Sequence, residues 1–146
     1  MRLYLDMCSI QRPLDTKSQV RIAMEAEAVV SLLAMCEQGE LELVASPALF
    51  FEAGRNPHPA RREFALGVLA QARVMVGPEP EIEMKARFLE RIGIKPLDAL
   101  HLASAEAALA DFFCTCDDRL LKRARALPLG STNVVSPLEL ITEVMK

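Results

Sequence analysis

The stretch Phe112–Ala124, FFCTCDDRLLKRA, contains the pattern from which the fold can be predicted. Its first five residues are apolar or small, as in a strand that is buried on both faces of a sheet. Asp117 and Asp118 follow this strand directly, and the segment after them is predicted to be a short basic helix. A strand, an acidic turn and a helix in this order form one unit of an α/β protein.

The same alternation extends over the rest of the chain. Thr16 and Gln19 fit a capping box that would begin a long helix, and Arg12–Asp15 is predicted to be a loop. The sequence therefore predicts one three-layer α/β/α domain over residues 1–146, with a central, mainly parallel sheet of four to five strands. The expected strands are residues 2–6, 41–46, 73–76, 112–116 and 134–135, and the expected helices are residues 16–38, 47–54, 60–72, 81–92, 96–110, 117–125 and a helix from 137 onward.

Composition excludes several classes of protein. The chain has 146 residues, of which 51% are hydrophobic, and its net charge is -3, so it is not a disordered polyanion or a general DNA coat. No apolar run reaches the length of about 18 residues that a membrane span needs. No signal peptide is recognisable, and a cytoplasmic location is expected. The spacing of Cys114 and Cys116 is too short for a zinc site.

Acidic residues are predicted to gather at one edge of the sheet. Ligands of open parallel sheets bind beyond the carboxyl ends of the strands. Asp6 ends the first strand, Glu52 lies in the helix after the second, Asp117 and Asp118 follow the fourth, and Asp98 begins the helix before it. Each acid also has an ordinary explanation, as a helix cap, a partner of a helix dipole or a solvated side chain.

Taken together, these acids indicate a metal site. Two carboxylates about 4 Å apart repel each other by about 4 kcal/mol at an effective dielectric constant of 20. Three or four of them need shared protons or a cation, and few basic residues are adjacent in the sequence. Oxygen ligands favour Mg²⁺ or Mn²⁺, and a water on such an ion can attack a phosphodiester.

Four passages resemble, in the same order, the motifs of the PIN-domain family of metal-dependent ribonucleases, which includes VapC-type toxins. They are LYLDMCSIQRPLD at 3–15, VASPALFFEAGRNP at 44–57, KPLDALHLASA at 95–105 and FFCTCDDRLLKRA at 112–124. One departure is Met7-Cys8-Ser9, which stands where many relatives have Thr-Asn or Ser-Asn after the first acid. A thiol cannot reproduce the hydrogen bonds of an amide, so the surroundings of Asp6 are expected to differ.

The resemblance implies a Rossmann-like fold whose acidic pocket holds one or two Mg²⁺ or Mn²⁺ ions. It also implies hydrolysis of RNA to leave a 5′-phosphate and a 3′-hydroxyl. The implied site residues are Asp6, Asp98 and Asp117 as metal ligands, Glu52 completing the pocket, and Asp118, Thr115 and Ser9 in auxiliary roles.

Basic residues next to the acids are candidates for binding RNA phosphates. They are Arg119, Lys122 and Arg123 after Asp117, and Arg55 after Glu52. A solvated helix face is the alternative explanation for them. His101, three residues after Asp98, is expected to be a half-buried side chain that orients a neighbour rather than a metal ligand.

The sequence leaves two functions open. The first is a metal-dependent endoribonuclease, as the toxin of a toxin–antitoxin pair, with an inhibitory antitoxin protein as partner. The second is a catalytically silent PIN fold that binds RNA or protein. A homodimer through the Ala-rich helix from Asp98 to Ala110 is a further expectation, for which packing inside the domain is the alternative.

Overall fold

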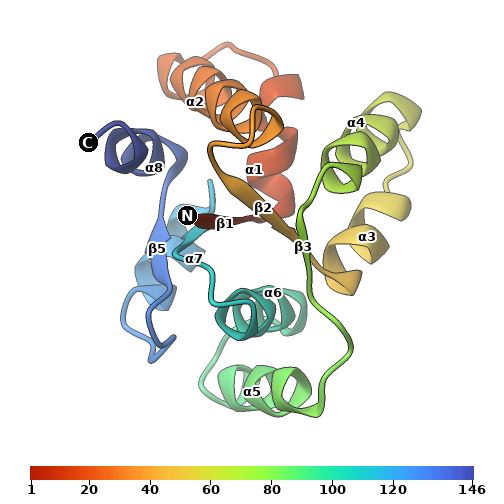
Figure 1. The fold of residues 1–146 in the computed structure, drawn as a ribbon, viewed down its shortest axis with the longest axis vertical. Coiled ribbons are helices and arrows are strands. Elements are labelled where there is room, and N and C mark those ends of the chain that lie inside the picture. The colour runs from red at the N-terminus through yellow and green to blue at the C-terminus, as the bar shows by residue number, and fades with distance from the viewer.

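Five parallel strands form the centre of the computed structural model, which describes residues 1–146. Their order across the sheet is β3-β2-β1-β4-β5, so β1 lies in the middle (Figure 1). Every neighbouring pair is parallel, and Leu3 of β1 is in register with Leu43 of β2 and Phe112 of β4. The strands are β1 Arg2–Leu5, β2 Glu42–Ala45, β3 Val74–Met75, β4 Phe112–Cys114 and β5 Asn133–Val135.

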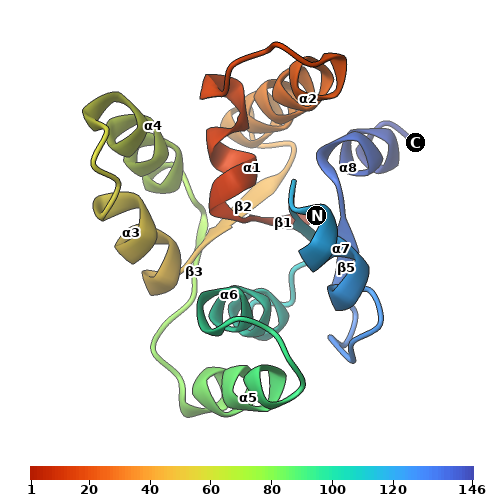
Figure 2. The same cartoon turned by 180° about the vertical axis from the view of Figure 1, so that it is seen from behind.

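Helices cover both faces of this sheet and confirm the three-layer arrangement. Helices α2 and α8 pack together on one side, and α5 and α6 pack together on the other (Figures 1 and 2). Helices α3 and α4 form a further pair beside β3. The helices are α1 Met7–Gln11, α2 Val20–Glu37, α3 Pro47–Gly54, α4 Pro59–Ala70, α5 Pro80–Arg91, α6 Pro96–Ala107, α7 Asp118–Ala124 and α8 Pro137–Val144, with a 3₁₀ turn at Arg12–Leu14.

The central strand β1 is buried on both faces. Leu3, Tyr4 and Leu5 are all inaccessible to solvent, which explains why this strand is an unbroken apolar run rather than an alternating one. The ring of Tyr4 stacks on that of Phe113 in β4, with ring centroids 5.4 Å apart. The carboxyl end of β1, where Asp6 follows, therefore lies at the middle of the sheet edge.

The structure corrects the expected course of residues 7–19. The predicted loop at Arg12–Asp15 is largely a 3₁₀ turn, and a short helix, α1, precedes it directly after Asp6. A helix of five residues is too short to give a periodic apolar pattern. The predicted capping box is wrong, because α2 begins only at Val20, after Gln19, and no side chain caps it.

Two predicted elements end earlier than expected. Strand β4 ends at Cys114 rather than residue 116, because Thr115 begins the turn into α7 and its Oγ1 accepts a hydrogen bond from the Asp117 N–H. Helix α6 ends at Ala107 rather than residue 110, and Leu109 has a positive φ of 55° that a helix cannot continue through. None of the helices combines the length and the apolar character that crossing a membrane requires.

Candidate active site

Asp6 and Asp117 leave the same edge of the sheet on neighbouring strands. Leu5 of β1 is paired with Cys114 of β4, and the chain continues from these residues to Asp6 and Asp117. Asp6 caps α1 and accepts a hydrogen bond from the Ser9 N–H at 3.1 Å. Asp117 caps α7 through its own carboxylate. Asp117 therefore has the capping role that the sequence offered as its ordinary explanation, whereas the capping role of Asp6 was not predicted. Capping fixes where each carboxylate lies.

Asp98 and Glu52 approach this edge from two helices that contact each other, α6 and α3. Burial raises the pKa of Asp98, and the negative charges of Asp6, Asp117 and Glu52 raise it further. Asp98 thus lies near enough to Asp6, Asp117 and Glu52 for the charge of each to act on its carboxyl group.

Asp6 is the most deeply buried of the four acids. Burial raises its pKa, because the charged carboxylate loses water. Hydrogen bonds from Thr115, Cys8 and Ser9 partly offset this effect. The thiol of Cys8 donates to Asp6 Oδ1 at 3.1 Å, in the place where many relatives carry an amide.

No lysine or arginine neutralises these acids. Asp6, Asp98 and Asp117 make no ion pair. The only hydrogen-bonding partner of the Glu52 carboxylate is His101, whose Nε2 lies 2.8 Å from Glu52 Oε1. The group therefore carries negative charge that the protein itself does not balance, which favours a bound cation.

The donor set fits Mg²⁺ or Mn²⁺ in its chemistry. All four groups are carboxylates, the hard oxygen ligands that these ions prefer. Nevertheless, no three His, Cys, Asp or Glu side chains lie close enough together to hold a metal ion. Mg²⁺ in proteins is usually held by one or two carboxylates and keeps several waters. A Mg²⁺ site at these carboxylates would therefore be open and hydrated rather than a closed protein cage.

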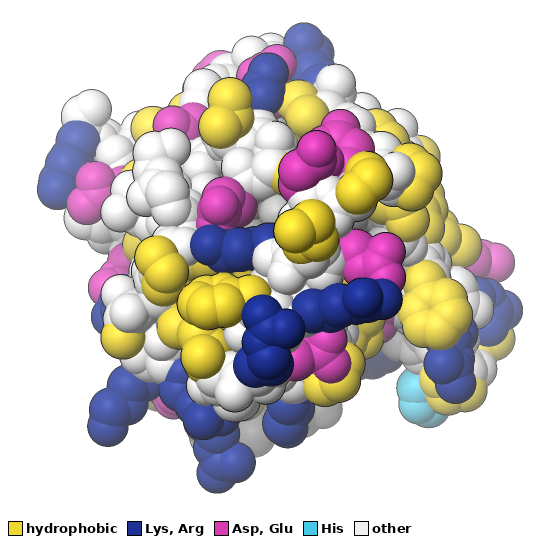
Figure 3. Space-filling view, turned by 90° about the horizontal axis from the view of Figure 1, so that it is seen from below, with side chains coloured by type: hydrophobic (Ala, Val, Ile, Leu, Met, Phe, Trp, Pro, Cys, Tyr) yellow, Lys and Arg dark blue, Asp and Glu magenta, His cyan; other side chains and the backbone are white.

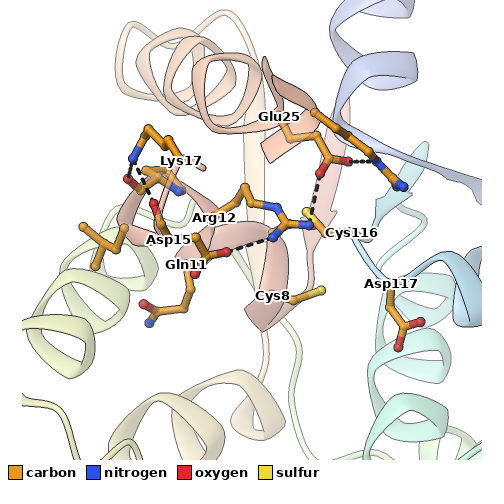
Figure 4. A network of polar contacts seen from close by, with 12 residues as sticks. Cys8, Gln11, Arg12, Asp15, Lys17, Glu25, Cys116 and Asp117 are labelled. Carbon is orange, nitrogen blue, oxygen red and sulfur yellow. Dashed lines mark hydrogen bonds and ion pairs between the residues drawn. The ribbon is translucent and has the colours of Figure 1, made fainter. Parts of the chain in front are cut away.

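Asp118 belongs to a different group of charges. Arg21 of α2 binds both of its oxygens, at 2.7 and 2.5 Å, and lowers its pKa. Arg21 also lies 3.6 Å from Glu25, which in turn contacts Arg12 at 3.0 Å (Figure 4). Asp118 therefore joins α7 to α2, whereas the sequence predicted an auxiliary role beside the metal.

The side chains of Ser9 and Thr115, predicted to be auxiliary, form hydrogen bonds with backbone groups. Ser9 Oγ donates to the carbonyl oxygen of Cys114 at 3.1 Å, which ties α1 to β4. Thr115 Oγ1 accepts from the Asp117 N–H at 3.0 Å and also contacts Cys8 Sγ at 3.6 Å. Both side chains thus hold the two turns from which Asp6 and Asp117 project.

His101 is buried, not half-buried, and it connects Glu52 to the core. Its Nδ1 lies 2.6 Å from Tyr4 Oη, and Tyr4 Oη lies 2.7 Å from Ser46 Oγ. Sequence reasoning missed Tyr4 and Ser46. The signal in the sequence was a single phenol in an otherwise aliphatic strand, since a buried tyrosine hydroxyl usually has a polar partner.

The predicted RNA-binding residues differ in their surroundings. Arg119 and Lys122 are exposed and their side chains make no ion pair, whereas Arg123 donates to the carbonyl of Gly93 at 2.9 Å. Arg55 lies over the exposed ring of Phe51, 5.1 Å from its centroid. The face over α5 mixes basic, acidic and hydrophobic side chains and has no single basic patch (Figure 3).

Comparisons with known proteins agree with this fold. The family model of the PIN domain matches residues 9–126. A VapBC2 complex from Rickettsia felis, bound to a DNA fragment from its promoter, aligns with a TM-score of 0.59 and 12% identity over 93% of this chain and 98% of that chain. FitAcB from Neisseria gonorrhoeae aligns with a TM-score of 0.54 and 17% identity over the same shares of the two chains. No curated protein matches.

The matched segment includes Glu52, Asp98 and Asp117 and begins three residues after Asp6. It covers most of the chain, and the two solved structures have the same overall fold at low sequence identity. The chain therefore belongs to the PIN-domain family.

Proposed function

We propose that this protein is an endoribonuclease that hydrolyses RNA phosphodiester bonds with the help of Mg²⁺ or Mn²⁺. One observation carries the proposal: Asp98 lies within the electrostatic influence of Asp6, Asp117 and Glu52, and no basic side chain neutralises the group. Glu25, a buried acid outside this group, is by contrast paired with Arg12. An unpaired group of carboxylates at the sheet edge is what a cation site requires.

In this proposal Asp6, Asp98 and Asp117 hold the ion, and Glu52 completes the pocket directly or through water. A bound ion would supply Lewis-acid chemistry here: it would ease deprotonation of a water for attack on phosphorus and would stabilise charge on the leaving oxygen. The capped positions of Asp6 and Asp117 keep their carboxylates at fixed places while substrate binds.

Positive charge for the RNA backbone comes from residues near the acids. Arg119 and Lys122 are free and follow Asp117 within one and a half turns of helix. Arg55, beside Phe51, lies one turn after Glu52. Arg123 is the weakest candidate, because its guanidinium already binds Gly93.

A role as the toxin of a toxin–antitoxin pair extends the proposal. It is supported by the likeness in fold to VapBC2 and FitAcB. The activity of a cytoplasmic nuclease must be inhibited until it is needed, and an antitoxin protein that covers the acids would inhibit it.

A homodimer of this chain is a further part of the proposal. Sedimentation or light scattering measures the oligomeric state and checks it.

A catalytically silent module remains the second candidate function. Two observations favour it: the thiol of Cys8 beside Asp6, and the absence of three acids close enough to hold an ion as they stand. Such a module binds RNA or protein equally well in the presence of a chelator.

The test is cleavage of mixed RNA by the wild-type protein, Asp98→Asn and Asp118→Asn, each with Mg²⁺, Mn²⁺ or chelator. Asp118→Asn is the matched control, because it removes the same charge from a carboxylate that Arg21 already occupies. We expect metal-dependent cleavage by the wild type and the control and a loss of roughly a hundredfold or more in Asp98→Asn. Chelator-independent RNA binding without cleavage would identify the silent module instead.

A further inference from the structure

We propose that His101 is a positioning residue that holds the Glu52 carboxylate in the active site, and that Tyr4 and Ser46 fix the orientation of its imidazole. This inference rests on the proposed nuclease function, because it gives Glu52 a task there. The three residues come from β1, the start of α3 and α6, so they join three elements that surround the acids.

The hydrogen bonds run in one direction. Ser46 Oγ accepts the N–H of Leu49 at 3.2 Å, and its only other hydrogen bond is with Tyr4 Oη, so its own proton points to Tyr4. The phenol proton then points to His101 Nδ1, at 2.6 Å.

With Nδ1 accepting, the imidazole carries its proton on Nε2. That N–H faces Glu52 Oε1 at 2.8 Å, a normal length for a charge-assisted hydrogen bond. In this arrangement the protons of Ser46 Oγ, Tyr4 Oη and His101 Nε2 all have an acceptor. If His101 Nδ1 instead donated to Tyr4 and Tyr4 donated to Ser46, the buried Ser46 proton would have no acceptor, which is costly.

The hydrogen-bonded residues differ in burial: Tyr4, Ser46 and His101 lie in the core, whereas Glu52 is partly exposed. Tyr4 and Ser46 are inaccessible, His101 is 2% exposed, and the side chain of Glu52 is 33% exposed. A half-exposed glutamate normally samples several rotamers and faces water. The hydrogen bond from a fixed imidazole removes that freedom and turns one carboxylate oxygen toward the protein, leaving the other for the pocket.

The alternative is that His101 serves only core packing and Glu52 is an ordinary surface residue. Two conservative substitutions separate these cases, because the amide of Gln takes the place of Nε2 and that of Asn takes the place of Nδ1. His101→Gln keeps a donor for Glu52, whereas His101→Asn keeps only the contact with Tyr4. A packing role predicts similar losses for both, in proportion to their thermal stability.

We expect His101→Gln to retain most of the RNA cleavage activity and His101→Asn to lose about tenfold in kcat, about 1.4 kcal/mol, with little change in KM. Circular dichroism melts check that both variants are folded. In a Glu52→Ala background the difference between Gln and Asn should disappear, because His101 acts through Glu52. Equal losses in the two variants, or a difference that persists without Glu52, would overturn the proposal.

Nitrogen NMR of the imidazoles tests the geometry independently of cleavage. The chain has only two histidines, and His58 lies exposed in a loop, so a His58→Gln variant assigns the signals. A proton on Nε2 of His101 in the wild type supports the proposal, and a proton on Nδ1 alone overturns it. An inactive wild type with the Nε2 proton in place would refute the nuclease function, and with it the task of Glu52, but not the hydrogen bond.

Discussion

The pairing of Arg12 with Glu25 should contribute far more to stability than the neighbouring contact of Arg21, although both arginines approach the same carboxylate. The side chain of Glu25 is 1% exposed, that of Arg12 is 18% exposed and that of Arg21 is 49% exposed. At 3.0 Å and an effective dielectric constant of 20, the attraction between Arg12 and Glu25 is about 5–6 kcal/mol. At 3.6 Å and the dielectric constant of water, that of Arg21 is about 1 kcal/mol.

Arg12→Met therefore leaves a buried carboxylate without its main partner and should lower the free energy of unfolding by about 3–5 kcal/mol. Arg21→Met, the matched control, removes only the contacts of a half-exposed guanidinium with Glu25 and Asp118 and should cost at most about 1 kcal/mol. Neither oxygen of Glu25 accepts a hydrogen bond of good geometry, so the pair is held mainly by charge. Replacing both partners, Arg12→Met with Glu25→Leu, should recover most of the loss.

Urea denaturation followed by circular dichroism measures these differences. The reasoning predicts a large loss for Arg12→Met, a small one for Arg21→Met and recovery in the double variant. It is refuted if the two single variants lose the same stability, or if the double variant is as unstable as Arg12→Met alone.

Three further predictions concern the acids and the tyrosine. The pKa of Asp98 is raised in the folded state, so the stability gained from this group is full below its unfolded pKa of about 4 and is lost as pH rises through the folded value. Asp98→Asn should accordingly unfold at higher urea concentration than the wild type at about pH 7 and at the same concentration at about pH 3; a gain that persists at the lower pH contradicts this. Mg²⁺ should raise the melting temperature of the wild type by several degrees and that of Asp98→Asn by much less, measured by calorimetry with and without chelator. Tyr4→Phe should cost about 2–4 kcal/mol in urea denaturation, because it strands Ser46 Oγ and His101 Nδ1 in the core, and a cost under about 1 kcal/mol would mean that water replaces the phenol.

The sheet and the group of acids could be predicted from the sequence, because they depend on short local patterns and on the general geometry of parallel sheets. Short apolar runs indicate the strands, and the rule that parallel strands share a carboxyl edge is enough to place Asp6 near Asp117. Glu52 and Asp98 are placed at the same edge because their helices adjoin these strands and begin at prolines that the sequence displays. The PIN resemblance then assigns all four acids to one site.

The contacts that fix these acids could not be predicted from the sequence. Tyr4 and His101 are 97 residues apart, as are Arg21 and Asp118, and nothing local marks either pair. A hydroxyl in a strand or a carboxylate in a turn has many potential partners, and only the packing of helices on the sheet selects one. Helix α1 was missed for a different reason, since one turn and a half of helix is stabilised by its cap at Asp6 rather than by an apolar stripe.

The place of β1 between β2 and β4 has a consequence for synthesis of the chain. Its first neighbour, β2, is about 40 residues away, but its other neighbour, β4, is about 110 residues away. At a translation rate of about 5–20 residues per second, roughly 5–20 s pass between the emergence of Asp6 and that of Asp117. The nascent chain is thus unable to assemble the four acids during this interval. If the proposed nuclease function holds, the ribosome is not exposed to an active enzyme until nearly the whole domain has been translated.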